Sequence, residues 1–571
     1  MRKLLVLCIL ACVSLAFADD SKISPDLRTK LGTQNPTVVV QYNQAPSLLD
    51  LQGILNLAGT ILSDLPVVNA VVAQLPLSEI LSLSNQANVK YISLNRTQQS
   101  NLSNAAPAVN AFAAWQSGYT GAGVGVALID SGVSAHPDLT GGFLGGSRVV
   151  WNQSFVPGNG STVDQYGHGT HIAGLIAGDG ASSIGSNYTR TFKGIAPGAN
   201  LVNLRVLDQN GAGTDSAVIA AINTAILLKP LFNIRVINLS LGRPVYESYA
   251  LDPVCQAVEA AWRSGIVVVV AAGNDGRYQG TNGYATINSP GNDPSVITVG
   301  AMKPMGTPTR NDDLIASYSS KGPTAIDHIV KPDVVAPGNL LVSLESAGTL
   351  YNTYPGNRVP YNYYVNGGSS APSTSYFTLS GTSMAAGVVS GVVADLLQKS
   401  PQLNPDQVKA RLMKTAWKSF PASSSVFDPT TGLTYTDQYD VFTVGAGYVD
   451  VEAALASTDV AKGSAKSPTA AYDPKSGNVY FTNDPTAVWN SSAMWGSGTV
   501  WGSSQFVGST SAMWGSSAMW GSSAMWGSSA MWGSSTSEGF STVWAGSAMW
   551  GSSAMWGSSA MWGSSAAAGE R

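Results

Sequence analysis

Apolar runs alternate with helix-like stretches over residues 106–456 of the sequence. The runs are nearly unbroken, and they are GVGVALID (123–130), NLVNLRVL (200–207), IRVINLSLG (234–242), GIVVVVAAGN (265–274) and SVITVGA (295–301). Such strands are typical of a parallel sheet that helices cover on both faces. We therefore predict an α/β domain. In such sheets ligands bind beyond the carboxyl ends of the strands, so polar residues that close an apolar run are candidates for chemistry.

A smaller pattern precedes this domain, over residues 19–105. Two helix-like stretches separate three apolar runs, which are TVVVQYN (37–43), VVNAVVAQLP (67–76) and NVKYISL (88–94). This pattern predicts an α+β unit with the element order β-α-β-β-α-β, as in ferredoxin-like folds. A polar stretch over residues 95–108 predicts an exposed joint.

The first 18 residues have the pattern of a secretory signal peptide. Arg2 and Lys3 precede an apolar run, and small residues before position 19 predict cleavage after Ala18. We expect no later stretch to reach the roughly 18 apolar residues that a membrane-spanning helix needs. The mature chain is therefore expected to be secreted and to carry no transmembrane segment.

The end of the sequence is of low complexity. An expected linker (457–488) leads to a tail (489–571) in which the hexapeptide SAMWGS recurs. An even period puts every Trp on one face of an extended strand, and six residues also match one side of a β-solenoid. A disordered Gly/Ser-rich tail is the alternative. Because exposed tryptophan promotes association, we favour attachment to a surface, an insoluble substrate or like chains over a copper site of Met and Trp.

Composition narrows the possible partners. Only 11% of the residues are charged, and 34 acidic against 30 basic residues give a net charge of −4. Without a basic face, neither nucleic acid nor an anionic membrane is an expected partner. Cys8 and Cys12 lie in the predicted signal peptide, so Cys255 has no intramolecular partner and is expected to be a small buried apolar residue.

Four polar residues close apolar runs or open helix-like stretches: Asp130, His168, Asn274 and Ser383. Asp130 and Ser383 could be simple caps of a turn and a helix. His168 and His171 could suggest zinc, but no HExxH glutamate or nearby cysteine supports a metal site. Together the residues supply a hydroxyl, a base and a carboxylate for nucleophilic catalysis, and an amide that could donate to an oxyanion.

The order Asp–His–Ser is one of the known orders of a catalytic triad, and the surrounding motifs resemble those of the subtilisin-like (subtilase) serine peptidases. These motifs are LIDSGVSAHPDL (128–139), HGTHIAG (168–174), SLG (240–242), AAGN (271–274) and SGTSMAA (380–386). The resemblance implies a subtilisin-like three-layer fold and a serine endopeptidase. It implies that Ser383 is the nucleophile, His168 the general base and acid, and Asp130 the orienting carboxylate.

The resemblance also implies how substrate is held. Asn274 and the backbone N–H of Ser383 would form the oxyanion hole. Protein or peptide substrates would bind along two strand edges and a pocket segment, which are Gly211, Ala212 and Gly213, then Ser240, Leu241 and Gly242, then Ala271, Ala272 and Gly273. The small uncharged pocket segment favours an apolar residue before the scissile bond. His136 and His171 would be structural.

The unit over residues 19–105 resembles the inhibitory propeptides of this family. The chain would then be a self-processing proenzyme that is held inactive by its own propeptide and cleaved between Arg96 and Pro107. No cofactor is expected to be required. The recognisable calcium loop of the best-known members is missing, which leaves Asp138 as a possible calcium ligand.

One departure from the family motif and one alternative function stand beside this resemblance. Gly387 and Val388 stand where the family commonly has Pro and His. Gly387 and Gly391 share one face of a helix, which predicts that this helix crosses a neighbour closely. A different class of function, an adhesive or surface-layer protein with a peptidase-like scaffold, is the alternative. We favour the enzyme because all three triad residues and Asn274 are present.

Overall fold

The computed structural model describes residues 22–23, 27, 35–65, 69–94, 105–142, 146–307, 309–429, 431–473, 478–482, 504–507 and 570. The predicted signal peptide, nearly all of the predicted cleavage region and the SAMWGS repeats lie outside the described residues. The chain divides into an N-terminal unit (residues 1–99) and a main unit (residues 100–571). The division falls inside the predicted joint.

The N-terminal unit has the predicted element order β-α-β-β-α-β. Its elements are β1 (Thr37–Tyr42), α2 (Leu48–Asn56), β2 (Thr60–Leu65), β3 (Ala70–Gln74), α3 (Leu77–Ser84) and β4 (Val89–Leu94). The strands form an antiparallel sheet in the order β2-β3-β1-β4. Buried side chains from the sheet and both helices, such as Val40, Ile54 and Leu83, give the unit a hydrophobic core of its own.

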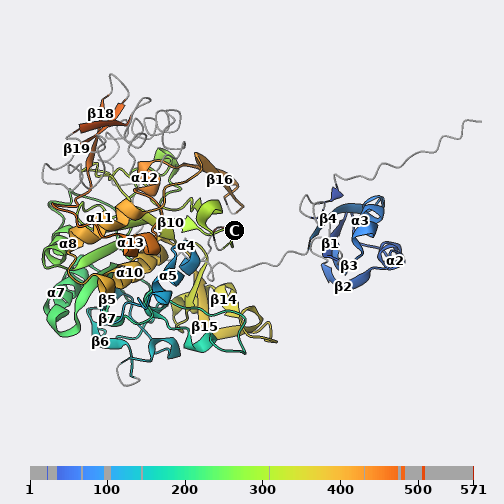
Figure 1. The fold of residues 1–571 in the computed structure, drawn as a ribbon, viewed down its shortest axis with the longest axis horizontal. Coiled ribbons are helices and arrows are strands. Elements are labelled where there is room, and N and C mark those ends of the chain that lie inside the picture. The colour runs from blue at the N-terminus through green and yellow to red at the C-terminus, as the bar shows by residue number, and fades with distance from the viewer. Residues whose placement is uncertain are drawn as a thin grey trace, which may run out of the picture. The chain divides into compact units, whose positions relative to one another are not determined.

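A largely parallel sheet forms the centre of the main unit, as predicted (Figure 1). Its strands are β5 (Gly125–Asp130), β6 (Val149–Ser154), β7 (Asn200–Arg205), β8 (Ile234–Leu239), β9 (Val267–Ala271), β10 (Ile297–Lys303), β11 (Leu314–Ile315) and β12 (Val334–Pro337). The order is β11-β10-β9-β8-β5-β7-β6, and β12 also pairs with β10. Only the β10–β11 pair is antiparallel among these pairs. Every residue of β5, β9 and β10 is buried, which explains their unbroken apolar runs.

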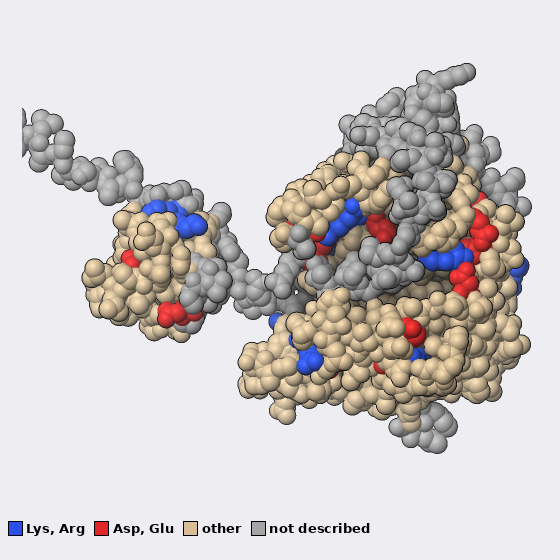
Figure 2. Space-filling view, turned by 180° about the vertical axis from the view of Figure 1, so that it is seen from behind, with Lys and Arg blue, Asp and Glu red and all other residues tan. Residues whose placement is uncertain are grey.

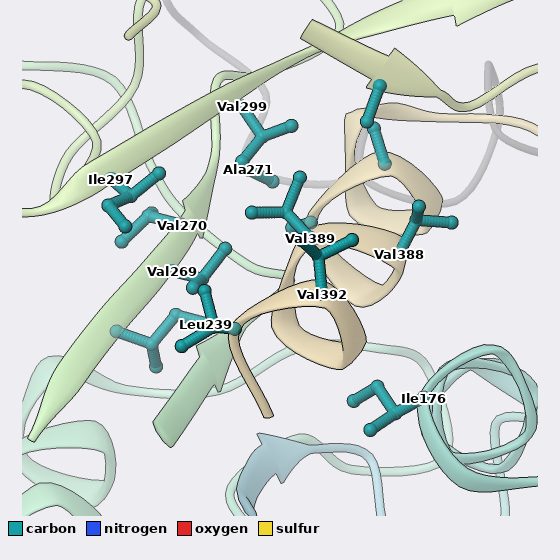
Figure 3. Packing of buried hydrophobic residues seen from close by; sticks show 14 of the residues in the cluster. Ile176, Leu239, Val269, Val270, Ala271, Ile297, Val299, Val388, Val389 and Val392 are labelled. Carbon is teal, nitrogen blue, oxygen red and sulfur yellow. The ribbon is translucent and has the colours of Figure 1, made fainter. Parts of the chain in front are cut away.

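Helices cover both faces of this sheet. On one face α6 (His168–Ala177) packs against β5 and β7, and α10 (Thr382–Lys399) packs against α6, β8, β9 and β10. On the other face α7 (Asp215–Phe232) packs against β5, β7 and β8, and α8 (Pro253–Arg263) packs against α7 and β9. Figure 3 shows Val388, Val389 and Val392 of α10 among sheet residues such as Val299, with Ile176 of α6 beside them.

The glycines of α10 allow a close helix crossing, as predicted. A Cβ added at Gly391 would lie 2.6 Å from Cβ of Ile195, and one added at Gly387 would lie 3.3 Å from Cγ2 of Ile172 in α6. Despite the departure at Gly387 and Val388, α10 is one continuous helix of 18 residues.

One helix bears on the prediction that no segment crosses a membrane. α7 is long and apolar enough to cross a membrane by length and composition, with a mean hydropathy of 1.4 and 28% of its length buried. The sequence analysis missed it because Asp215 and Lys229 interrupt the apolar run. Here α7 lies on the sheet and beside α8.

Smaller elements surround the sheet. They are α4 (Ala105–Ala108), α5 (Ala111–Gln116), β13 (Leu341–Leu344), α9 (Thr349–Thr353), β14 (Arg358–Pro360), β15 (Pro372–Leu379), α11 (Pro405–Thr415), β16 (Ser423–Asp428), β17 (Leu433–Gln438), α12 (Val441–Val444), α13 (Val451–Ala456), β18 (Thr469–Asp473), β19 (Asn478–Thr482) and β20 (Ser504–Val507). The expected linker thus contains β18 and β19. β20, within the expected tail, pairs with β19.

Candidate active site

The end of β5 and the start of α6 bring Asp130 and His168 together. Asp130 is the last residue of β5, and His168 is the first residue of α6. Nδ1 of His168 lies 2.8 Å from Oδ1 of Asp130, and both side chains are buried. Because a carboxylate only accepts hydrogen bonds, Nδ1 carries the proton and Nε2 of the neutral ring is a base.

Asp130 also sets the proton affinity of His168. Burial acts to lower the pKa of His168, but the charge of Asp130, its hydrogen bond and the charge of Asp164 together raise this pKa above its usual value. The arrangement therefore stabilises an imidazolium, as a general base requires after it has taken a proton. Oδ1 of Asp130 accepts a further bond from the backbone N–H of Ser131 at 2.7 Å.

Two residues that the sequence analysis missed hold this pair in place. Asp164 is buried and accepts hydrogen bonds from the backbone N–H groups of Gly167 (2.7 Å) and Thr170 (2.8 Å). Ser131 Oγ donates to Asp164 (2.8 Å) and accepts from the backbone N–H of Gly169 (2.9 Å). The end of β5 is thereby tied to the first turn of α6. The signal in the sequence is an acidic residue shortly before a helix whose N-cap, a glycine, has no capping side chain.

Ser383 is the second residue of α10, so its backbone N–H has no acceptor within the helix. Its hydroxyl donates to the backbone oxygen of Ser240 at 3.1 Å, and Ser240 Oγ donates to the backbone oxygen of Ser383 at 2.8 Å. In the described part of the chain no hydrogen bond joins Ser383 to His168. The structure thus holds the predicted nucleophile at a helix N-terminus, with its hydroxyl turned toward the end of β8.

Thr382 fixes the orientation of the Asn274 amide. Asn274 follows β9, and its Oδ1 accepts from the backbone N–H (2.9 Å) and from Oγ1 (3.1 Å) of Thr382. Oγ1 of Thr382 also donates to the backbone oxygen of Gly273 at 3.1 Å. Among the described residues Nδ2 of Asn274 has no acceptor, so this N–H group is available beside the first turn of α10.

A cavity of about 330 Å³ opens beside His168. Both segments that were predicted to bind substrate, Gly211 to Gly213 and Ser240 to Gly242, line it, although neither lies in a strand of the structure. The remaining lining is largely apolar and includes Leu207, Val218 and Val254. At the wall Arg243 pairs with Asp215 (3.0 Å) and Asp252 (2.9 Å), so these charges satisfy one another.

The predicted pocket segment does not line this cavity. Ala271 and Ala272 are buried, and Figure 3 shows Ala271 within the hydrophobic core. A Cβ at Gly273 would lie 2.7 Å from both the Asn288 amide and the Ser320 hydroxyl. The three residues run from the end of β9 to Asn274.

The other histidines of the motifs are held by structural contacts. Nε2 of His171 lies 3.0 Å from the Leu341 oxygen and 3.1 Å from the Phe377 oxygen, and burial together with the nearby His168 lowers its pKa to about 3. His136 accepts from the backbone N–H of Asp138 and contacts the Ser375 oxygen. Cys255 is fully buried, as predicted, and burial raises its thiol pKa.

Asp138, the possible calcium ligand, is surrounded by protein donors. Its carboxylate oxygens accept from the backbone N–H of Ser182 (2.8 Å) and from the Tyr376 hydroxyl (2.7 Å). Within the described ranges no group of three or more His, Cys, Asp or Glu side chains is placed to hold a metal ion. Asp138 therefore ties a loop to β15 in this structure.

Charged side chains of the described residues are sparse on the face that Figure 2 shows. On the face that Figure 2 shows, basic and acidic residues are scattered among uncharged ones, and several of opposite sign lie next to one another. The described residues visible on this face form no extended basic patch.

Known proteins share this sequence pattern. Residues 121–447 match the model of the subtilase family. Serine protease AprX of Bacillus subtilis (strain 168) is 39% identical over 339 residues, which cover 58% of this chain and 70% of AprX. Subtilisin DY of Bacillus licheniformis is 35% identical over 349 residues, which cover 61% of this chain and 96% of that protein. The chain belongs to the subtilase family and is a subtilisin-like serine endopeptidase.

Proposed function

We propose that this endopeptidase hydrolyses peptide bonds through Asp130, His168 and Ser383. The observation that carries the proposal is the 2.8 Å contact between Oδ1 of Asp130 and Nδ1 of His168. This contact fixes the tautomer of the ring, and the raised pKa of His168 reflects a stabilised imidazolium. The raised pKa and the position of Ser383 at the start of α10 support the same assignment.

The chemistry begins with a rotation of the Ser383 hydroxyl. In the free enzyme Oγ donates to the Ser240 oxygen, and a change of χ1 moves it to another staggered position. Catalytic hydrogen bonds of this kind often form only when substrate is bound. Oγ then attacks the scissile carbonyl carbon while Nε2 of His168 takes its proton. The imidazolium returns that proton to the leaving amine, and water repeats the sequence on the acyl-enzyme.

Asn274 and the start of α10 are proposed to hold the oxyanion. Thr382 fixes Oδ1 of Asn274, which leaves Nδ2 as the donor. The backbone N–H of Ser383 is the second donor, and the positive end of the α10 dipole favours negative charge there. These donors are already in place before the charge develops.

Substrate is proposed to bind as an extended strand along Gly211 to Gly213 and Ser240 to Gly242. Such edges pair with the substrate backbone and accept many sequences. The apolar walls formed by Leu207, Val218 and Val254 favour an apolar substrate side chain. The charges of Arg243 and Asp215 are mutually satisfied and do not select a charged side chain.

The N-terminal unit is proposed to be an inhibitory propeptide of an exported proenzyme. Its own core supports independent folding. Leu48 and Leu49 are 86% and 84% exposed, which gives this unit an apolar surface suited to docking. Sequencing of the N-terminus of the secreted protein should place the mature start between Arg96 and Pro107. A mature chain that still begins at residue 19 would contradict the proposal.

The segment beyond residue 488 is proposed to attach the enzyme to a surface or an insoluble substrate. Truncation near Ala487 should leave peptide hydrolysis intact and weaken retention on cells or particles. Equal retention of the truncated and full chains would rule out this role.

Covalent labelling tests the catalytic assignment. A fluorophosphonate should modify the purified enzyme on Ser383, as identified by peptide mass spectrometry, and Ser383→Ala should remove both the label and peptide hydrolysis. Ser390→Ala, in the same helix, is the matched control and should keep both. A folded, processed wild type that is not labelled would favour a scaffold without catalysis.

A further inference from the structure

Glu570, which follows the repeats in the sequence, is buried against the main unit. Only 5% of its surface is exposed. One carboxylate oxygen, Oε1, accepts from Nη2 of Arg277 (2.9 Å), from the backbone N–H of Ser317 (2.8 Å) and from the Ser317 hydroxyl. The backbone N–H of Glu570 donates to Oδ1 of Asn339, and its backbone oxygen accepts from Nδ2 of the same amide, each at 2.8 Å.

The groups that hold Glu570 are themselves fixed. Nε of Arg277 donates to the Ser317 hydroxyl (2.7 Å), and Nη1 donates to Asp428 of β16 (2.9 Å). The guanidinium also lies over the ring of Tyr435 in β17, 4.9 Å from its centre. Asn339 is fully buried. Apart from Glu570, the only described partner of the Asn339 side chain is the Tyr318 hydroxyl, 3.5 Å from Oδ1. Without an occupant most of the hydrogen-bonding capacity of this buried amide would be unmet, which is costly.

The contacts define what the pocket recognises. The Asn339 amide pairs with both backbone groups of one residue, as a neighbouring strand would, and therefore reads an extended peptide. A guanidinium and an N–H group on one oxygen select a carboxylate side chain. The combination fits a glutamate within an extended peptide segment.

The pocket adjoins the loops that carry the active site. The residues on either side of Asn339 bond to the segment before Ser383: the Gly338 oxygen accepts from the Gly381 N–H (2.7 Å), and the Leu340 N–H donates to Ser380 Oγ (2.8 Å). On the other side of the pocket, Arg277 follows Asn274 by three residues. An occupant of the pocket therefore contacts residues that are linked to both the Asn274 loop and the segment before Ser383.

We propose that Arg277, Ser317 and Asn339 form a docking site for a glutamate-containing peptide segment, which Glu570 of the same chain occupies. Glu570, which follows β20 and the repeats in the sequence, is then bound at the main unit. The docking site is independent of the catalytic roles proposed above, since none of its three residues belongs to the triad.

Hydrogen exchange of the full chain tests this docking. The Ser317 N–H donates to Glu570 and, among the described residues, to no other acceptor. Glu570→Ala should therefore raise the exchange rate of the Ser317 amide by about tenfold or more, since hydrogen bonds to charged groups contribute at this scale. Glu570→Gln, which keeps an acceptor without the charge, should give a smaller increase. Glu452→Ala, at an exposed glutamate of α13, is the control and should change nothing.

Addition of a peptide gives a second readout on the same protein. The peptide Ala-Ala-Gly-Glu-Arg, added to the full-length Glu570→Ala chain, should restore protection at Ser317, and the version with Gln for Glu should not. Unchanged exchange at Ser317 in Glu570→Ala would overturn the docking site. A wild-type dimer that becomes a monomer in Glu570→Ala would overturn docking within one chain and assign Glu570 to the pocket of a second copy.

Discussion

Two buried carboxylates in the main unit, Asp130 and Asp333, have cationic or titratable partners but very different surroundings. Both oxygens of Asp333 are bonded: Oδ2 accepts from Lys331 (2.7 Å) and the Thr298 N–H (2.8 Å), and Oδ1 from Ser467 (2.5 Å), with Lys409 at 3.1 Å. Asp130 uses one oxygen for His168 and Ser131, and its Oδ2 has no partner within the described ranges.

The difference agrees with a structural role for Asp333 and with the catalytic role that we propose for Asp130. Asp333 lies between two lysines that are fully buried, so its charge is compensated by groups that do not reach solvent. Removing one partner of such a cluster leaves an unpaired buried charge, which is strongly destabilising. Asp130 instead faces an imidazole beside a cavity, where a proton can arrive and leave.

Asp130→Asn should have the largest effect, and on catalysis. The amide can hold the His168 ring in the wrong tautomer, and for serine-peptidase triads in general this substitution lowers kcat about 10⁴-fold. Steady-state hydrolysis of a chromogenic peptide measures the loss, and chemical denaturation should show little change in stability. A variant that keeps kcat within tenfold would remove Asp130 from the triad.

Asp333→Asn should show the opposite pattern. The change leaves Lys331 and Lys409 without their counter-charge, so we expect a loss of about 3–5 kcal/mol in the free energy of unfolding. The kcat of the molecules that stay folded should be unchanged. Denaturant titration and active-site titration together separate the two quantities, and a fall in kcat at constant stability would contradict the distinction.

The sequence motifs predicted the site around Asp130 but not the cluster around Asp333. Asp130, His168, Asn274 and Ser383 stand in local patterns that mark strand ends and helix starts, so their types and positions indicated chemistry. The Asp333 cluster depends on Ser467, 134 residues away, and no local pattern reports such a contact. Asp164 and Ser131 were missed for a related reason, because their role lies in bonds between loops.

The sheet was predicted from its unbroken apolar runs, whereas the cavity was not fully predicted. Ala271 and Ala272 precede Asn274 in a family motif, yet the pleat and the packing of α10 bury them. β18 and β19 were assigned to a linker because short strands of mixed polarity give a weak signal.

The pH dependence of activity and of stability should distinguish the roles of the two carboxylates. The proposed mechanism requires neutral His168, whose pKa is raised, so kcat/KM should rise with pH through a midpoint above the ordinary value of about 6.5. Lys331 and Lys409 outweigh the effect of burial and lower the pKa of Asp333. Its stabilising contribution is therefore complete above pH about 3.9 and is lost as the pH falls through the lowered pKa.

Variants of each carboxylate sharpen this test. Asp130→Asn should lower the midpoint of the residual activity, because the charge that raises the His168 pKa is gone. Asp333→Asn should leave that midpoint unchanged and flatten the loss of stability in acid. A midpoint that moves equally in both variants would mean that the two carboxylates are electrostatically coupled to the same histidine.

Ser467→Ala should give the smallest effect. It removes one neutral donor from Asp333 while both lysines remain, so we expect a loss of about 1–2 kcal/mol in unfolding free energy. Ser423→Ala, at an exposed position of β16, is the control and should have no measurable effect. A loss of unfolding free energy as large as that of Asp333→Asn would show that Ser467, rather than the lysines, stabilises the cluster.

The most direct test of the catalytic assignment is a crystal structure of the enzyme after reaction with a fluorophosphonate. We predict a bond from phosphorus to Oγ of Ser383, a phosphoryl oxygen within hydrogen-bond distance of Asn274 Nδ2 and the Ser383 N–H, and His168 still bonded to Asp130 with Nε2 facing the adduct. An adduct on another residue, or a His168 ring that faces away from a modified Ser383, would contradict the account.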